Sequence, residues 1–76
     1  MPKSIYDPEY RKIIDVLRDA RTGLGMSQQV LADRLKRPQS FVAKVEGYER
    51  RLDVAEFIQV CRALGVEPAL VFGLAS

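Results

Sequence analysis

The sequence predicts a small all-α domain. Apolar residues recur at spacings of three and four along most of the chain, and helix caps and turn residues divide it into five short segments. With 76 residues, 47% of them hydrophobic and 29% charged, the chain is near the lower size at which a domain buries an adequate core. We therefore expect one compact five-helix domain over residues 1–76.

The first helix is predicted to run from Pro8 to Gly23. Asp7 is a suitable N-cap, and proline is favoured at the first helical position. The apolar stripe of this helix consists of Tyr10, Ile13, Ile14, Leu17 and Ala20. Glycine is a common helix stop, so Gly23 is its expected end.

Two shorter helices follow, and their arrangement is that of a helix-turn-helix over about residues 28–46. Ser27 is the expected cap of the first, and a turn from Lys36 to Pro38 separates the two. The residues expected to face the core are Leu31, Ala32, Leu35, Val42 and Val45.

The fourth helix has a clear start signal, because Asp53 and Glu56 have the spacing of a capping box. Gly65 is its expected end. Its predicted apolar face consists of Phe57, Ile58, Cys61 and Leu64.

The last segment, about residues 66–76, is apolar on nearly every side. Two helical turns cannot bury so many apolar residues against one small core. We therefore expect part of this segment to stay exposed and to form a homodimer interface, with a frayed tail as the alternative. The residues expected in the interface are Val71, Phe72 and Leu74.

Basic residues are concentrated between Arg34 and Arg51. This segment holds six Lys or Arg and two Glu, a local net charge of +4, whereas the whole chain carries +2. Such a distribution is typical of a protein that binds a polyanion, although it also occurs on ordinary solvated surfaces.

The composition argues against several other classes of function. With no histidine and one cysteine, the chain lacks the ligands of a usual transition-metal site, and no cofactor is expected. No nucleophile is paired with a base at a recognisable spacing, so we expect no enzymatic activity. The longest apolar run has four residues, far below the roughly 20 of a membrane span, which predicts a cytoplasmic protein without a membrane partner.

The second helix of the pair is predicted to expose short polar and basic side chains near its N-terminus. Glutamine can form a bidentate pair with adenine, and lysine can reach a guanine edge or a phosphate. The residues expected on this face are Gln39, Ser40, Phe41 and Lys44. They favour double-stranded DNA as the partner.

Four stretches of the chain form a specific pattern: MSQQVLADRL at residues 26–35, PQSFVAKVE at 38–46, RRLD at 50–53 and RALG at 62–65. In these stretches the chain resembles the repressor and Cro-type helix-turn-helix proteins of phages and bacteria, over roughly residues 17–72. The resemblance implies a transcriptional regulator with five helices. It also implies that the third helix enters the major groove and that a dimer binds two-fold related operator half-sites.

The resemblance implies base contacts at the start of the third helix. Gln39 and Ser40 match the first base-reading positions, and Lys44 matches a later position that contacts a base or a phosphate. Phe41 is unusual at its position. It could touch a thymine methyl or a sugar, or it could fold back onto Arg37.

Other positions have implied contacts with the DNA backbone or implied structural roles. Gln28 matches a position that contacts phosphate and braces the first side chain of the recognition helix. The backbone contacts expected in total are those of Gln28, Arg37, Arg50 and Arg51. Arg21 and Glu46 match a buried ion pair that ties the first helix to the end of the third.

Two turns depart from the family pattern. Lys36 stands where glycine is common, so a positive φ is expected there. In the next loop, Gly47 and Tyr48 stand where the pattern usually places its glycine one residue later.

A protein-interaction module, or the antitoxin of a toxin pair, is the alternative function for the same fold. A protein-binding face is expected to be apolar and depleted of charge. Gln39, Ser40 and Lys44 suit DNA better, and only Phe41 favours the alternative. The expected partners are therefore DNA and a second copy of the chain, with a toxin or other protein left open.

Overall fold

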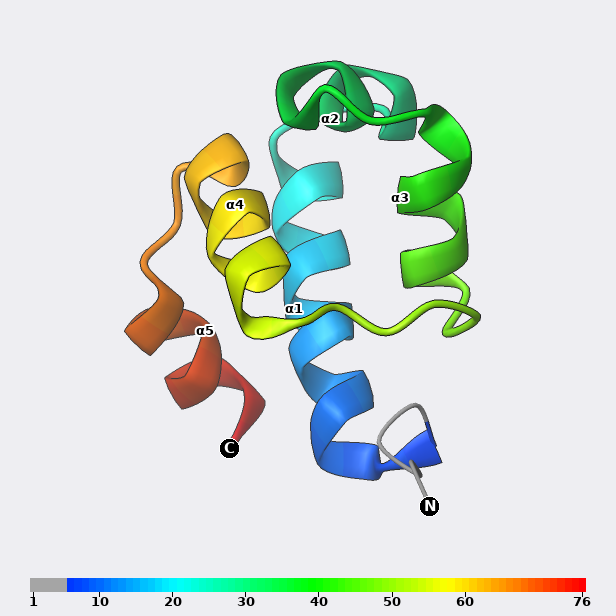
Figure 1. Ribbon diagram of the computed structural model, residues 1–76. Helices are drawn as coiled ribbons and strands as arrows, with labels where there is room; N and C mark the ends of the chain where they lie inside the picture. Colours follow the sequence, from blue (N-terminus) through cyan, green and yellow to red (C-terminus); the bar gives the residue numbers. More distant parts are fainter. Residues whose placement is uncertain (1–5) are drawn as a thin grey trace.

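The computed structural model describes residues 6–76, which contain five α-helices and no strand. The helices are α1 (Pro8–Gly23), α2 (Gln28–Leu35), α3 (Gln39–Glu46), α4 (Val54–Leu64) and α5 (Pro68–Ala75). α1 contacts α3, α4 and α5, while α2 contacts both α3 and α4 (Figure 1). The all-α prediction is confirmed. The predicted domain also included residues 1–5, which lie outside the described residues.

Three helices begin at the caps that the sequence predicts. Asp7 caps α1 and Ser27 caps α2 through side-chain oxygens that accept backbone N–H groups. At the start of α4, the Asp53 carboxylate accepts from the Glu56 amide at 2.7 Å, and the Glu56 carboxylate accepts from the Asp53 amide at 3.1 Å. Gly65 follows α4 with a φ of 71°, a conformation that glycine adopts easily.

The core is formed by all five helices, the turn before α2 and the loop before α4. Its buried hydrophobic residues are Ile14, Leu17, Met26, Leu31, Ala32, Phe41, Val42, Val45, Leu52, Val60, Cys61, Leu64 and Val71. Burial raises the pKa of the Cys61 thiol. The expectation that Ile58 faces inward is wrong, because the buried stripe of α4 runs through Glu56, Val60 and Leu64, and Ile58 lies away from it.

α5 buries one narrow stripe and exposes the rest of its surface. Val71 is 1% exposed, which corrects its assignment to a dimer interface, since a residue enclosed in the monomer core cannot touch a partner. Phe72 and Leu74 are 52% and 65% exposed. The Phe72 ring also stacks on Phe57 of α4, with 5.2 Å between the ring centroids. Side chains in a helix point in all directions, so a short helix can bury only the ones that face its neighbour.

The turns on both sides of α3 contain a non-glycine residue in the left-handed region. Lys36 has a φ of 57°, as the sequence predicts, and Tyr48 has a φ of 60°. The Tyr48 hydroxyl donates a hydrogen bond to Asp15 of α1, so its side chain anchors the loop. Space is tight at Gly47, because a Cβ there would lie 3.1 Å from the carbonyl oxygen of Ala43.

No single helix among residues 6–76 is long and apolar enough to cross a membrane. α4 and α5 reach that length and composition only as a pair bent by 100°. Over the same range, no group of His, Cys, Asp and Glu side chains is placed to hold a metal ion.

Candidate nucleic-acid interface

The candidate interface is the outer face of α3 with the turns at its two ends. Gln39, Ser40 and Lys44 are exposed there, whereas Val42 and Val45 are buried on the opposite side of the helix. The buried valines fix the helix against the core. The three polar side chains therefore point outward from a rigid element.

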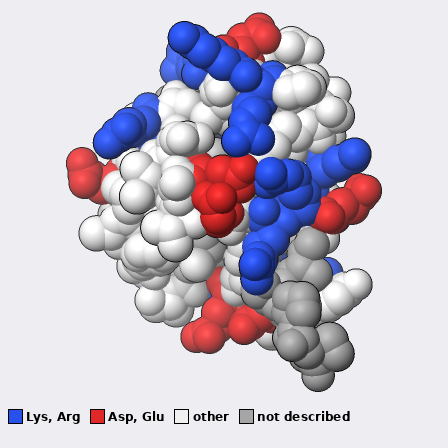
Figure 2. All heavy atoms as spheres, in the orientation of Figure 1, with Lys and Arg blue, Asp and Glu red and all other residues white. Residues whose placement is uncertain are grey.

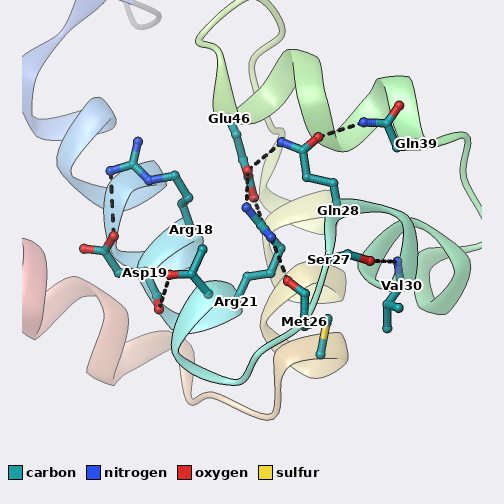
Figure 3. Close-up of polar contacts among 10 residues, drawn as sticks. Arg18, Asp19, Arg21, Met26, Ser27, Gln28, Val30, Gln39 and Glu46 are labelled. Carbon is teal, nitrogen blue, oxygen red and sulfur yellow. Dashed lines mark hydrogen bonds and ion pairs between the residues drawn. The ribbon is translucent and has the colours of Figure 1, made fainter.

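A series of hydrogen bonds runs from α1 to the exposed start of α3 (Figure 3). Arg21 donates to the Glu46 carboxylate through Nε at 2.7 Å and through Nη2 at 2.9 Å. The Gln28 amide donates to the same carboxylate at 2.9 Å, and the Gln28 carbonyl oxygen accepts from Gln39 at 2.7 Å. Arg21 also donates to the backbone oxygen of Met26, which ties the turn before α2 into the series.

This series determines which groups of Gln39 remain available. A glutamine amide has two N–H donors and one carbonyl acceptor, and Gln39 gives one donor to Gln28. Its other N–H and its carbonyl oxygen have no partner among residues 6–76. One donor beside one acceptor is the pattern with which glutamine pairs with the major-groove edge of adenine.

A second cluster lies where the turns around α3 meet α4. Arg50 donates to both oxygens of the Glu56 carboxylate at 2.9 and 3.0 Å, and Arg37 donates to one of them at 3.1 Å. The two guanidinium carbons lie over the Phe41 ring, 4.5 and 4.8 Å from its centroid. Hydrogen bonds from Arg50, from the Asp53 amide and from Arg37 lower the pKa of Glu56 to about 2, although its burial acts in the opposite direction.

The expectation of a base contact from Phe41 is corrected by this cluster. The side chain is only 8% exposed, because it fills the core between α3 and the arginines. Of the two placements that the sequence left open, Phe41 has the one in which it packs against Arg37.

Charge is unevenly distributed over this surface. Figure 2 shows basic side chains that extend from the α2 end of the molecule down the side of α3, with acidic side chains between them and α4. Arg51 is exposed in the loop after α3, and its backbone oxygen accepts a hydrogen bond from Arg50 at 3.1 Å. Arg37 precedes α3 and Arg50 and Arg51 follow it, so the arginines expected to contact the DNA backbone lie in the segments that flank α3.

Sequence reasoning missed the part that Glu56 takes in this site. The spacing from Asp53 identified it as a helix cap, which it is. No sequence pattern indicated that two arginines from the flanking turns of α3 would meet on the same carboxylate.

Comparison with known proteins gives the family. Residues 17–71 match the helix-turn-helix family. The chain belongs to this family. The match covers α2, α3 and α4 completely and parts of α1 and α5, and the repressor and Cro-type resemblance is confirmed. This helix-turn-helix protein is a DNA-binding regulator of transcription.

Solved structures similar to this helix-turn-helix protein include an XRE-family like protein from Pseudomonas syringae pv. tomato str. DC3000. It is 45% identical, with a TM-score of 0.86, over 96% of this chain and 89% of that chain. The restriction-modification controller protein C.AhdI from Aeromonas hydrophila is 32% identical, with a TM-score of 0.72, over 79% of this chain and 91% of that chain.

A third similar structure is the controller protein C.Esp1396I, solved as a tetramer in complex with its natural 35 base-pair operator. It is 22% identical, with a TM-score of 0.77, over 84% of each chain, and this likeness shows the fold alone. No curated protein sequence matches the chain.

Proposed function

We propose that this helix-turn-helix protein binds an operator of two-fold symmetry as a homodimer, with α3 of each copy in the major groove. The observation that carries this proposal is the hydrogen bonding of the Gln39 side chain. Its side chain is held by Gln28 at the exposed start of α3 with one amide donor and one acceptor available. A side chain ordered in this way reads an adenine edge with little further loss of conformational freedom.

The remaining residues of the interface divide into two roles. Ser40 and Lys44, exposed on α3, add base contacts or, for Lys44, a phosphate contact. The backbone contacts come from Gln28, Arg37, Arg50 and Arg51. Contacts to phosphate increase affinity and fix the register of the protein on the duplex, but they carry no sequence information directly.

The homodimer is supported by the exposed apolar side chains of α5. Leu70, Phe72 and Leu74 are all more than half exposed on a helix of eight residues. Exposed apolar surface of this kind typically marks an association site. The tetramer of C.Esp1396I on its operator is an assembly of the same fold on DNA. In a dimer, the operator half-sites are expected about 10 to 10.5 base pairs apart, or a multiple of that.

The burial of Phe41 weakens the alternative function as a protein-interaction module or antitoxin. An exposed aromatic residue on α3 was the feature that favoured a protein partner. With Phe41 in the core, the exposed face of α3 carries Gln39, Ser40 and Lys44, which are polar or charged. A face of this composition suits DNA.

In vitro selection from random duplex DNA, read by sequencing at two salt concentrations, tests the proposal. We expect enrichment of an inverted repeat. The matched control is the variant with both Gln39→Ala and Ser40→Ala, which should lose part of the preferred sequence while it still binds DNA in a salt-dependent way. Enrichment of no sequence by the wild type, with only weak salt-sensitive binding, would overturn the proposal and favour a protein partner.

A further inference from the structure

We propose that Glu56 is a positioning residue for DNA binding. It holds Arg37 and Arg50 over the Phe41 ring, so that the two guanidinium groups form one preordered phosphate-binding pair. This inference rests on the proposed function, and it adds a residue of α4 to a site otherwise built from α2, α3 and their turns.

The geometry joins the two ends of α3 through one carboxylate. Arg37 lies in the turn before α3 and Arg50 in the loop after it, and both donate to Glu56 at 2.9 to 3.1 Å. The Glu56 side chain is itself held, because its Oε1 also accepts from the Asp53 amide in the capping box. The start of α4 thus fixes the carboxylate, and the carboxylate fixes the arginines.

Both arginines keep donors for a phosphate. A guanidinium group has five N–H donors. Arg50 uses three of them, two on Glu56 and one on the Arg51 backbone, and Arg37 uses one on Glu56. Both side chains remain more than one third exposed, while the Glu56 side chain is almost enclosed. The buried side of each guanidinium therefore meets the protein, and the outer side is open to a ligand.

Phe41 gives the pair a rigid support. Its ring belongs to the core, and both guanidinium groups lie over it within 5 Å of the centroid. An arginine that is already ordered loses less conformational freedom when it binds phosphate. This arrangement accounts for an aromatic residue at a position of α3 where the family resemblance implies a base contact. The ring acts on DNA through the arginines above it.

The decisive variant is Glu56→Gln. Glutamine keeps a carbonyl oxygen for the cap but loses the charge that holds both arginines. We expect DNA binding to weaken by about five- to thirty-fold on the selected operator and on random duplexes alike, with the preferred sequence unchanged. The variant lacks one negative charge, so its net charge is more positive by one, and long-range electrostatics alone predicts tighter binding. Weaker binding of Glu56→Gln therefore indicates that Glu56 positions the arginines, whereas tighter binding indicates an effect of net charge alone.

Three controls make the test specific. Glu67→Gln makes the same change in charge at an exposed position before α5, and it should bind equally or more tightly. In a background with Arg37→Ala and Arg50→Ala, Glu56→Gln should change the affinity by less than about twofold, because its effect passes through the arginines. Phe41→Leu, which keeps an apolar side chain and the net charge, should weaken binding in the same sense as Glu56→Gln.

Binding is measured well below each melting temperature, with the active fraction determined by stoichiometric titration. If Glu56→Gln or Phe41→Leu binds DNA as tightly as the wild type, or if Glu56→Gln weakens binding equally in the double-alanine background, the inference is overturned. These outcomes are distinct from failure of the proposed function, in which the wild type itself selects no operator.

Discussion

Arg21 of α1 and Glu46 at the end of α3 form a bidentate ion pair with N···O distances of 2.7 and 2.9 Å. Both side chains are only 11% exposed. Because Glu46 also accepts from Gln28, which in turn holds Gln39, the pair does more than join two helices. It sets the position of the first base-reading side chain in the proposed interface.

Arg21→Ala should lower the free energy of unfolding by about 3 to 5 kcal/mol, because it leaves the nearly buried Glu46 carboxylate without its cation. Urea denaturation followed by circular dichroism measures this loss. Arg18→Ala is the matched control, since the Arg18 side chain is 40% exposed and its ion pairs with Asp15 and Asp19 are longer, at 3.6 and 3.7 Å. It should lose about 1 kcal/mol or less. Equal losses of unfolding free energy in the two variants would contradict the assignment of Arg21 and Glu46 as a stabilising, nearly buried ion pair.

Lys36→Gly should raise the melting temperature. Lys36 has a φ of 57°, and a residue with a Cβ in the left-handed region is strained by about 1 to 2 kcal/mol, which glycine relieves. Gln59→Gly, at an exposed position inside α4, should instead destabilise the protein by about 1 kcal/mol. A lower melting temperature for Lys36→Gly would mean that the turn has another conformation in solution.

Gln39→Ala should relax base preference at one position of each half-site, with a loss of about 1 to 3 kcal/mol for the preferred base. Gln28→Ala should reduce preference at that same position by a smaller amount, because Gln28 holds Gln39, and should also weaken binding to every sequence through the loss of its own phosphate contact. Arg50→Ala should weaken binding to every sequence. It should also reduce the slope of log affinity against log salt concentration by about one, as expected for the loss of one phosphate contact. Affinities for a panel of single-base operator variants distinguish the two patterns, and identical profiles for all three variants would refute this division of roles.

The low pKa of Glu56 predicts how stability depends on pH. This pKa is about 2 in the folded protein and about 4.3 in an unfolded chain, so the folded state favours the charged carboxylate. Its contribution is fully present above the unfolded pKa and is lost as the pH falls toward 2. Between pH 5 and 2, unfolding titrations should therefore show a steeper loss of stability for the wild type than for Glu56→Gln. Parallel curves would show that Glu56 is not held by the arginines.

Leu74→Glu should weaken the proposed homodimer. Leu74 is exposed on α5 and outside the core cluster, so a charge there opposes association without disturbing the monomer. Phe72→Glu should act in the same way but also breaks the stacking on Phe57. Sedimentation over a range of concentrations measures the effect. Leu24→Glu, at an exposed position just after α1, is the control and should leave association unchanged.

Local signals in the sequence were sufficient to predict the helices. Asp7, Ser27 and Asp53 cap the helices that they were expected to cap, because a cap acts on backbone groups only two or three residues away. The left-handed Lys36 was predicted from its place in the helix-turn-helix pattern. The exposure of Gln39, Ser40 and Lys44 followed from the period of α3 in the same way.

α4 and α5 carry apolar residues on several sides, and only packing decides which of these side chains point into the core. Periodicity treats Val71 and Phe72 alike, yet one is enclosed and the other half exposed, because the angle at which α5 meets the rest of the core selects the buried stripe. The same holds for Ile58 and Val60 on α4.

The sequence by itself determined the all-α class, the capped starts of α1, α2 and α4 and the exposed polar residues of α3, since each depends on spacings of a few residues. Tertiary structure decided that Phe41 is buried, that Arg37 and Arg50 share the Glu56 carboxylate, and that Tyr48 reaches Asp15. These contacts join residues from different helices and loops. Local patterns carry no information about such pairs, because their distance depends on how the helices cross.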